Sequence, residues 1–443
     1  MKIRGLVIAA VILAGLEGAL YWSNHHKPAE TAEASANGPP KILSLKQDDI
    51  NKLAIKDDKG NDVALMKDGS GNWKITAPQA LAADDNAVSS LLATVSSLSS
   101  DRLVEEKAAN LNQYGLSSPP LQVDIEEKDK KAQKLLIGDS TPTGNLYAKL
   151  DGDPRVFTIS SYLKASLDKT TDDLRDKRLI TIDPDKVSKF EVVAKNEDLE
   201  FGRDKDAWQI VKPAPSRADQ GEADQLVRAV TDARMVFAKD EGQQKVGAAF
   251  AAGTPIGIAK VTGSSGTQEL EVRKDKNEYY AKSSLLAGVY RVAGTVGVDM
   301  EKKPDEFRSK KLFDFGYEDP DKVELHEGSK AYYLTKGGDD WWSGDGKKLD
   351  SSSALNFLDK LRDLSASKFV DSGFSNPAVE ISVKPHGGKT AEKVFIAKHG
   401  NDYIAKRENE PALYQLDGKT VDDLEKAAAD MKPAETLKST EKK

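Results

Sequence analysis

Residues 145–149 read Asn-Leu-Tyr-Ala-Lys, residues 278–282 read Glu-Tyr-Tyr-Ala-Lys, and residues 402–406 read Asp-Tyr-Ile-Ala-Lys. A second short alternating segment follows each motif, at 156–159, 289–292 and 413–416. Alternation of apolar and polar residues is typical of a strand with one buried face. Each motif therefore predicts a strand hairpin, and the chain contains that hairpin three times.

A hairpin that ends in tryptophan precedes each motif by a similar distance. The tryptophans are Trp73, Trp208 and Trp341, which are spaced 135 and 133 residues apart. Alternating residues and a turn come before each tryptophan, with strands expected at 63–66, 199–201 and 332–334. The near-constant spacing indicates internal repetition.

An amphipathic helix is expected after each tryptophan hairpin. Apolar residues recur at helical spacing in all three copies, and acidic or small polar residues begin each segment, as suits a helix N-terminus. The apolar positions are Val88, Leu91, Leu92, Val95 and Leu98, then Leu226, Val230, Ala233 and Phe237, then Leu355, Leu358, Leu361 and Leu364. A glycine–proline step then introduces further strands at 121–125, 256–259 and 379–383.

These features predict an α+β protein of three tandem, similar domains, each a mostly antiparallel sheet with helices packed on one face. The expected domains are 41–180, 181–314 and 315–432. A transmembrane anchor at 1–22 and a solvated tether at 23–40 precede them, and a charged tail at 433–443 follows. The first two copies end in a basic segment, at 174–179 and 307–312, which the third copy lacks.

The ordered combination resembles the bacterial family catalogued as domain of unknown function 4340. The features that carry it are the N-terminal anchor, the tryptophan hairpins, the Gly-Leu-x-x-Pro step at 115–119 and the Tyr-Ala-Lys strand at 147–149. The resemblance covers 42–433. Relatives are often encoded beside components of gliding-motility-type ABC transporters, which implies an accessory role in envelope transport. The family offers no catalytic residues to carry over.

The N-terminus predicts membrane attachment. An apolar run from Gly5 to Trp22 follows Lys2 and Arg4. Its 18 residues approach the length that spans a bilayer, and the preceding positive charges place the N-terminus in the cytoplasm. We expect an uncleaved anchor in the bacterial inner membrane with the bulk of the chain in the periplasm. A cleaved signal peptide is the alternative, although bulky residues follow the run.

Glu17 is the exceptional residue of this run, because a carboxylate within a membrane is costly. One interpretation is contact with a polar group of a partner membrane helix. The other, which we favour, is protonation or a position near the interface.

Composition excludes several classes of function. The 443 residues contain no cysteine, which excludes disulfides, thiolate catalysis and a lipoprotein anchor. The formal net charge is −7, which argues against nucleic acid as the main partner. The five histidines show no metal-ligand spacing, and no nucleophile or phosphate motif is present. We therefore expect no enzyme activity, no cofactor and no metal site.

The Tyr-Ala-Lys strands offer one candidate surface. Tyr147, Tyr280 and Tyr403 could bind a peptide or glycan from a strand edge. Cross-strand packing within the hairpins is the alternative that we favour, because a position that defines the fold should recur in every copy.

Three functions remain open from the sequence. The leading hypothesis is a non-catalytic, membrane-anchored envelope protein that binds partners or acts as a scaffold, compatible with an accessory role in an ABC-type transport system. The second is a periplasmic module that binds polysaccharide or peptidoglycan. The third is a hydrolase with a dispersed pair of carboxylates. The sequence fixes neither the oligomeric state nor the partner.

Overall fold

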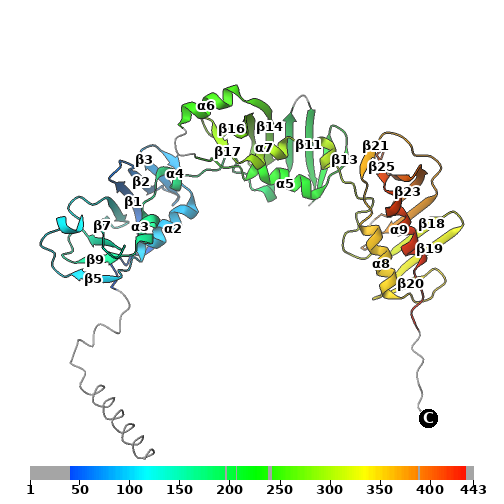
Figure 1. Cartoon of the computed structure of the whole chain (residues 1–443), viewed down its shortest axis with the longest axis horizontal. Coiled ribbons are helices and arrows are strands. Elements are labelled where there is room, and N and C mark those ends of the chain that lie inside the picture. The colour runs from blue at the N-terminus through cyan, green and yellow to red at the C-terminus, as the bar shows by residue number, and fades with distance from the viewer. Residues whose placement is uncertain (1–39, 195–196, 206, 238–241, 388–389, 436–443) are drawn as a thin grey trace, which may run out of the picture. The chain divides into compact units, whose positions relative to one another are not determined.

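The computed structural model describes residues 40–194, 197–205, 207–237, 242–387 and 390–435. The expected anchor with Glu17, residues 23–39 of the tether, and residues 436–443 of the tail lie outside the described residues. The chain divides into two compact units, 1–177 and 178–443, which are considered separately. Figure 1 shows one sheet in the first unit and two in the second.

The first sheet has nine strands in the order β4-β3-β2-β1-β6-β7-β8-β9-β5, and every neighbouring pair is antiparallel. Its strands are β1 (Ile50–Asp57), β2 (Val63–Lys67), β3 (Trp73–Ala77), β4 (Leu81–Ala82), β5 (Arg102–Glu105), β6 (Leu121–Glu127), β7 (Ala132–Ser140), β8 (Leu146–Leu150) and β9 (Val156–Ile159).

Helix α2 (Asp85–Ser96) connects the two edges of this sheet, from β4 to β5. Asp84 caps it by accepting hydrogen bonds from the backbone N–H groups of Asn86 and Ala87 (3.0 Å each). The apolar stripe of α2 shares one core with the inward residues of the strands, such as Leu53 and Ile55. The short helices α3 (Ser161–Leu167) and α4 (Thr171–Leu174) contact α2 and add to the same core.

The second sheet has eight strands in the order β13-β12-β11-β10-β14-β15-β16-β17, all antiparallel. Its strands are β10 (Lys189–Ala194), β11 (Glu197–Asp204), β12 (Ala207–Lys212), β13 (Ser216–Arg217), β14 (Thr254–Gly263), β15 (Gly266–Asp275), β16 (Glu278–Ser283) and β17 (Tyr290–Val292). Its helices are α5 (Gln220–Thr231), α6 (Gln243–Ala252) and α7 (Gly294–Met300).

The third sheet repeats the plan in the order β20-β19-β18-β22-β23-β24-β25-β21, again antiparallel. Its strands are β18 (Lys322–Glu327), β19 (Lys330–Gly337), β20 (Asp340–Ser343), β21 (Lys368–Val370), β22 (Val379–Lys384), β23 (Glu392–His399), β24 (Asp402–Arg407) and β25 (Leu413–Leu416). Helices α8 (Ser351–Arg362) and α9 (Gly418–Ala429) pack together on it, so a helix closes this copy despite the missing basic ending.

The tryptophans are buried on the helix-covered faces, which explains their recurrence. Trp73, Trp208 and Trp341 each belong to the core of their own sheet. The indole Nε1 of Trp208 also donates to Oδ1 of Asp224 on α5 (2.7 Å), which ties the hairpin to the helix above it. Each tryptophan therefore supplies a large apolar surface to its core, and Trp208 also helps to position α5.

The sequence predicted mostly antiparallel sheets with amphipathic helices, and that prediction is confirmed. The prediction that helices pack on one face needs a correction in the second sheet. Neighbouring strand residues Tyr279 and Tyr280 point to opposite faces; Tyr279 joins the main core, whereas Tyr280 packs on α6. Helix α6 therefore covers part of the second face of this sheet.

Adjacent tryptophans at 341 and 342 allow a test of this packing. Trp341 is 2% exposed and Trp342 is 38% exposed. Trp341→Ala should lower the free energy of unfolding of the third sheet by about 3–5 kcal/mol, because it leaves a cavity in the core. Trp342→Ala should cost about 1 kcal/mol or less. Urea unfolding followed by circular dichroism measures both, and equal costs would contradict this assignment of faces.

Candidate functional site

The three tyrosines singled out by sequence are packing residues. Tyr280 is 6% exposed and packs with Val246 and Phe250 of α6. Tyr403 is 8% exposed and lies in the core of the third sheet, with its hydroxyl 3.5 Å from Oδ1 of Asp422 on α9. A ligand-binding surface needs accessible rings, so the burial of these two rings favours the packing interpretation over the binding one.

Tyr147 is half-buried beneath the segment that precedes β6. Its ring lies 4.8 Å from that of Tyr114, beside a small cluster formed by Leu116, Leu136 and Val156. Like Tyr280, Tyr147 contributes to a minor core on the face opposite the main helices.

The motif alignment also places Tyr403 differently from the other two tyrosines. Counting from the buried alanine of each motif, Tyr403 corresponds to Tyr279 and Leu146, which all lie in the main cores. Ile404 is the residue that corresponds to Tyr147 and Tyr280. Because side chains alternate between faces, a shift of one residue exchanges the two cores.

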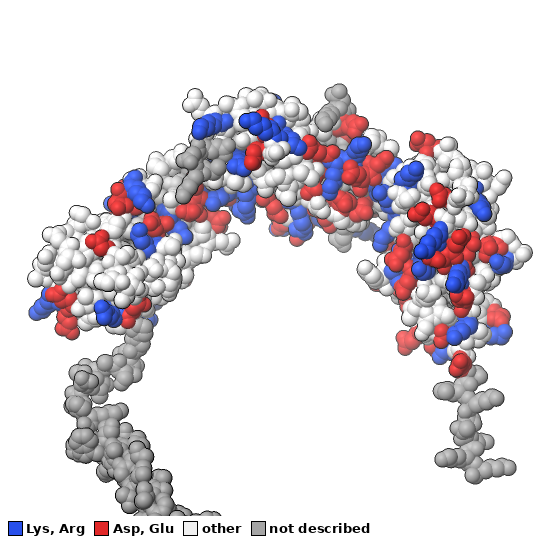
Figure 2. Space-filling view, viewed as in Figure 1, with Lys and Arg blue, Asp and Glu red and all other residues white. Residues whose placement is uncertain are grey.

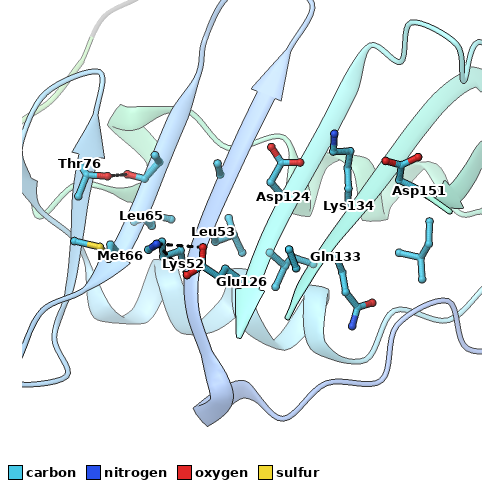
Figure 3. Close-up of a pocket in the computed structure, with 15 residues that line it drawn as sticks. Lys52, Leu53, Leu65, Met66, Thr76, Asp124, Glu126, Gln133, Lys134 and Asp151 are labelled. Carbon is cyan, nitrogen blue, oxygen red and sulfur yellow. Dashed lines mark hydrogen bonds and ion pairs between the residues drawn. The ribbon is translucent and has the colours of Figure 1, made fainter. Parts of the chain in front are cut away.

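The open face of the first sheet carries a hollow of about 730 Å³. Figure 3 shows its lining side chains on adjacent strands, with the helices behind the sheet. Ala54 on β1 and Ala64 on β2 lie directly opposite each other in it, and Ala54 is also opposite Asp124 on β6. Small side chains on neighbouring strands leave the space that forms the hollow. A volume of this size is within the range of ligand-binding clefts.

The other two sheets fill the corresponding positions with larger side chains. In the second sheet, Glu191 lies opposite both Glu200 and Lys260. In the third, Glu324 lies opposite both Tyr333 and Ser382. The hollow of the first sheet thus arises from two alanines where the other copies carry glutamate or tyrosine.

Ion pairs also close the open face of the second sheet. Glu200 accepts from Lys189 (3.0 Å) and Lys212 (2.9 Å), and Glu191 lies 3.8 Å from both Lys212 and Lys260. The hydrogen bonds from Lys212 and Lys189 hold the pKa of Glu200 below its ordinary value. These long charged side chains lie across the sheet where the first copy is hollow.

Charged residues line the rim of the hollow in the first sheet. Lys52 pairs with Glu126 (2.9 Å), and Lys56, just outside the lining, pairs with Asp124 (3.1 Å). Lys134 and Asp151 lie at the far side (Figure 3). The floor is apolar or small and the rim carries both signs of charge, which is the composition of a protein-binding surface.

The lining contains no aromatic residue. Figure 2 shows acidic and basic side chains interspersed among uncharged ones on the visible face. Within the described residues, no group of three histidine, aspartate or glutamate side chains is arranged to hold a metal ion. Within the same residues, no helix has the length and apolar character needed to cross a bilayer.

Sequence reasoning missed the hollow, although a signal for it was present. Aligning the copies on their buried strand residues places Ala54 with Glu191 and Glu324, and Ala64 with Glu200 and Tyr333. A search restricted to large or reactive residues overlooks such positions, because the distinctive residues are the small ones.

Comparison with known proteins gives one family match. The family model described as "Domain of unknown function (DUF4340)" matches residues 73–245 and again residues 208–385. The two matches begin at Trp73 and Trp208, one repeat apart, and each extends into the following copy. No curated protein and no solved structure matches the chain.

Access to the hollow can be measured by thiol labelling, because the chain has no cysteine of its own. Ala54 faces the hollow, whereas Ile55, the next residue of β1, is buried in the core and does not line the hollow. We expect Ala54→Cys to react rapidly with a small maleimide in the native protein and Ile55→Cys to react only after denaturation. Similar rates at the two positions would contradict an open hollow.

Proposed function

The chain belongs to the DUF4340 family, and we propose that it is a non-catalytic, membrane-anchored envelope protein that binds a protein partner through the hollow of its first sheet. The hollow carries the proposal, since the corresponding faces of the other two sheets hold larger side chains. The partner presents an apolar segment flanked by charged residues, to match the floor and rim.

The location rests on the N-terminal sequence. The apolar run from Gly5 to Trp22, preceded by Lys2 and Arg4, supports a single-pass anchor in a bacterial inner membrane with the bulk of the chain in the periplasm. A partner-binding surface on an anchored chain suits an accessory subunit of an ABC-type transport system. That part of the proposal depends on the family resemblance.

The alternative of a polysaccharide or peptidoglycan module has less support. Sugar rings commonly pack on exposed aromatic side chains. The tyrosines expected to provide them are buried or half-buried, and the hollow has no aromatic lining.

A hydrolase would use two of the carboxylates near the hollow. Asp124 and Glu126 are the nearest candidates, yet each already forms an ion pair with a lysine. This arrangement supports a structural role for both carboxylates.

Filling the hollow should weaken partner binding. We expect the double variant Ala54→Gln, Ala64→Gln to recover its partner from solubilised membranes at least about ten-fold less well than the wild type, a loss of about 1.4 kcal/mol. Uncharged glutamine fills the space without adding charge beside Asp124. Affinity purification followed by quantitative mass spectrometry measures the recovery.

Ala331→Gln is the matched control, because Ala331 is an exposed strand residue of the third sheet. It should recover the partner at the wild-type level. Equal recovery by the double variant, with unchanged circular dichroism, would reject the hollow as the site. Recovery of cell-wall fragments in place of protein would favour the polysaccharide alternative.

A further inference from the structure

A largely buried arginine connects the second and third sheets. Arg217 is the last residue of β13, at the edge of the second sheet, and its side chain is 15% exposed. Its Nε donates to Oε1 of Glu410 (2.7 Å), and Nη1 donates to both carboxylate oxygens of Asp314 (2.8 Å each). Glu410 lies between β24 and β25 of the third sheet, and Asp314 lies between Phe313 and Phe315, which belong to the core of that sheet, so the guanidinium extends from one sheet into the next.

The remaining donor capacity of Arg217 is also used. Nη2 donates to the carbonyl oxygen of Lys311 (2.5 Å) and to the hydroxyl of Tyr414 (3.2 Å). That hydroxyl in turn donates to Oε2 of Glu410 (2.6 Å). Burial, together with the hydrogen bond to Glu410, raises the pKa of Tyr414 to about 12. Burial alone would lower the pKa of Arg217, but the nearby carboxylates of Asp314 and Glu410 outweigh it and raise that pKa.

A second arginine completes the cluster from within the third sheet. Arg407 pairs with Glu410 (2.9 Å), Glu392 (3.3 Å) and Asp314 (3.5 Å). Burial raises the pKa of Glu392, and the backbone N–H of Asp314 donates to its Oε2 (2.9 Å). Removing Arg217 would therefore leave the half-buried carboxylates of Glu392 and Glu410, together with the exposed one of Asp314, with only one arginine between them, which is destabilising.

The backbone that joins the two sheets is held on both sides of this cluster. On the side of the second sheet, the N–H of Ser309 donates to the carbonyl of Arg217 (2.9 Å). On the side of the third sheet, the N–H of Leu312 donates to the carbonyl oxygen of Leu364 (2.9 Å), and the N–H of Ala366 donates to the carbonyl oxygen of Lys310 (2.8 Å). The connection is therefore an extended segment paired at both ends, with the guanidinium of Arg217 beside it.

The first sheet has no equivalent of this arginine. Ala83, Ala218 and Leu349 make the same isolated bridge to the closing segment of their own copies, with Arg175, Arg308 and Pro433. The residue before each is Ala82, Arg217 and Lys348 respectively. Ala82 has no hydrogen-bond donor in its side chain.

We infer that Arg217 is a clamp that makes the second and third repeats unfold and move as one body. The inference is independent of the proposed partner. It follows from the six hydrogen bonds that the Arg217 side chain donates, five of them to residues 311–414.

The test is hydrogen exchange and thermal unfolding of the full chain. In the wild type, the strands β14 of the second sheet and β22 of the third should lose protection in a single step. In Arg217→Ala, we expect that step to split in two, with the amides of Leu312 and Ala366 exchanging at least about ten-fold faster. Arg217→Lys should give an intermediate result, because an ammonium group lacks the planar fork that reaches two carboxylates at once.

Arg228→Ala is the matched control, because Arg228 pairs with Asp185 on the exposed surface of the second sheet. It should behave as the wild type. A single unfolding step with unchanged exchange in Arg217→Ala would overturn the inference. If Arg217→Ala does not fold, Asp314→Asn decides instead, since it removes one acceptor of the clamp: faster exchange at Leu312 supports the clamp, and unchanged exchange refutes it.

Discussion

Each repeat depends on one constraint: its antiparallel sheet has two faces, but the principal helices cover only one of them. The strand alternation commits residues such as Leu53 and Ile55 to the covered face and Ala54 to the other. An uncovered face must be closed by its own side chains or remain open to a partner. At the positions equivalent to Ala54 and Ala64, the second and third sheets fill this face with their own side chains, which are ion-paired glutamates in the second and a glutamate and a tyrosine in the third.

The first sheet leaves part of this face open. Along β7, Leu136 is buried beneath the segment that carries Tyr114, whereas Lys134, on the same face, borders the hollow. The same face therefore buries an apolar segment at one end and leaves space at the other. The three sheets are similar scaffolds, and two small residues distinguish the copy that we propose for binding.

Much of the fold could be predicted from the sequence because it depends on local periodicity. The tryptophan hairpins, the capped helices and the alternating strands are each indicated by a short local sequence pattern. The same patterns occur in all three copies, which strengthened each prediction. The orientation of Tyr403 was harder to predict. Tyr403 stands one motif position before Tyr147 and Tyr280, and a shift of one residue along a strand moves a side chain to the other face of the sheet. The contacts of Arg217 could not be predicted from the sequence. Arg217 is separated from Glu410 and Tyr414 by 193 and 197 positions along the chain, and no local sequence pattern indicates contacts at such separations.

The central claim is that the hollow of the first sheet faces a protein partner in the cell envelope. Site-specific photo-crosslinking in intact membranes tests it most directly. A photoreactive residue at Met66, which lines the hollow and is exposed, is compared with one at Lys260 on the corresponding face of the second sheet. We predict a discrete crosslink to a membrane or envelope protein from position 66 and none from position 260. Crosslinks of equal yield from both positions, or none from position 66, would contradict the account.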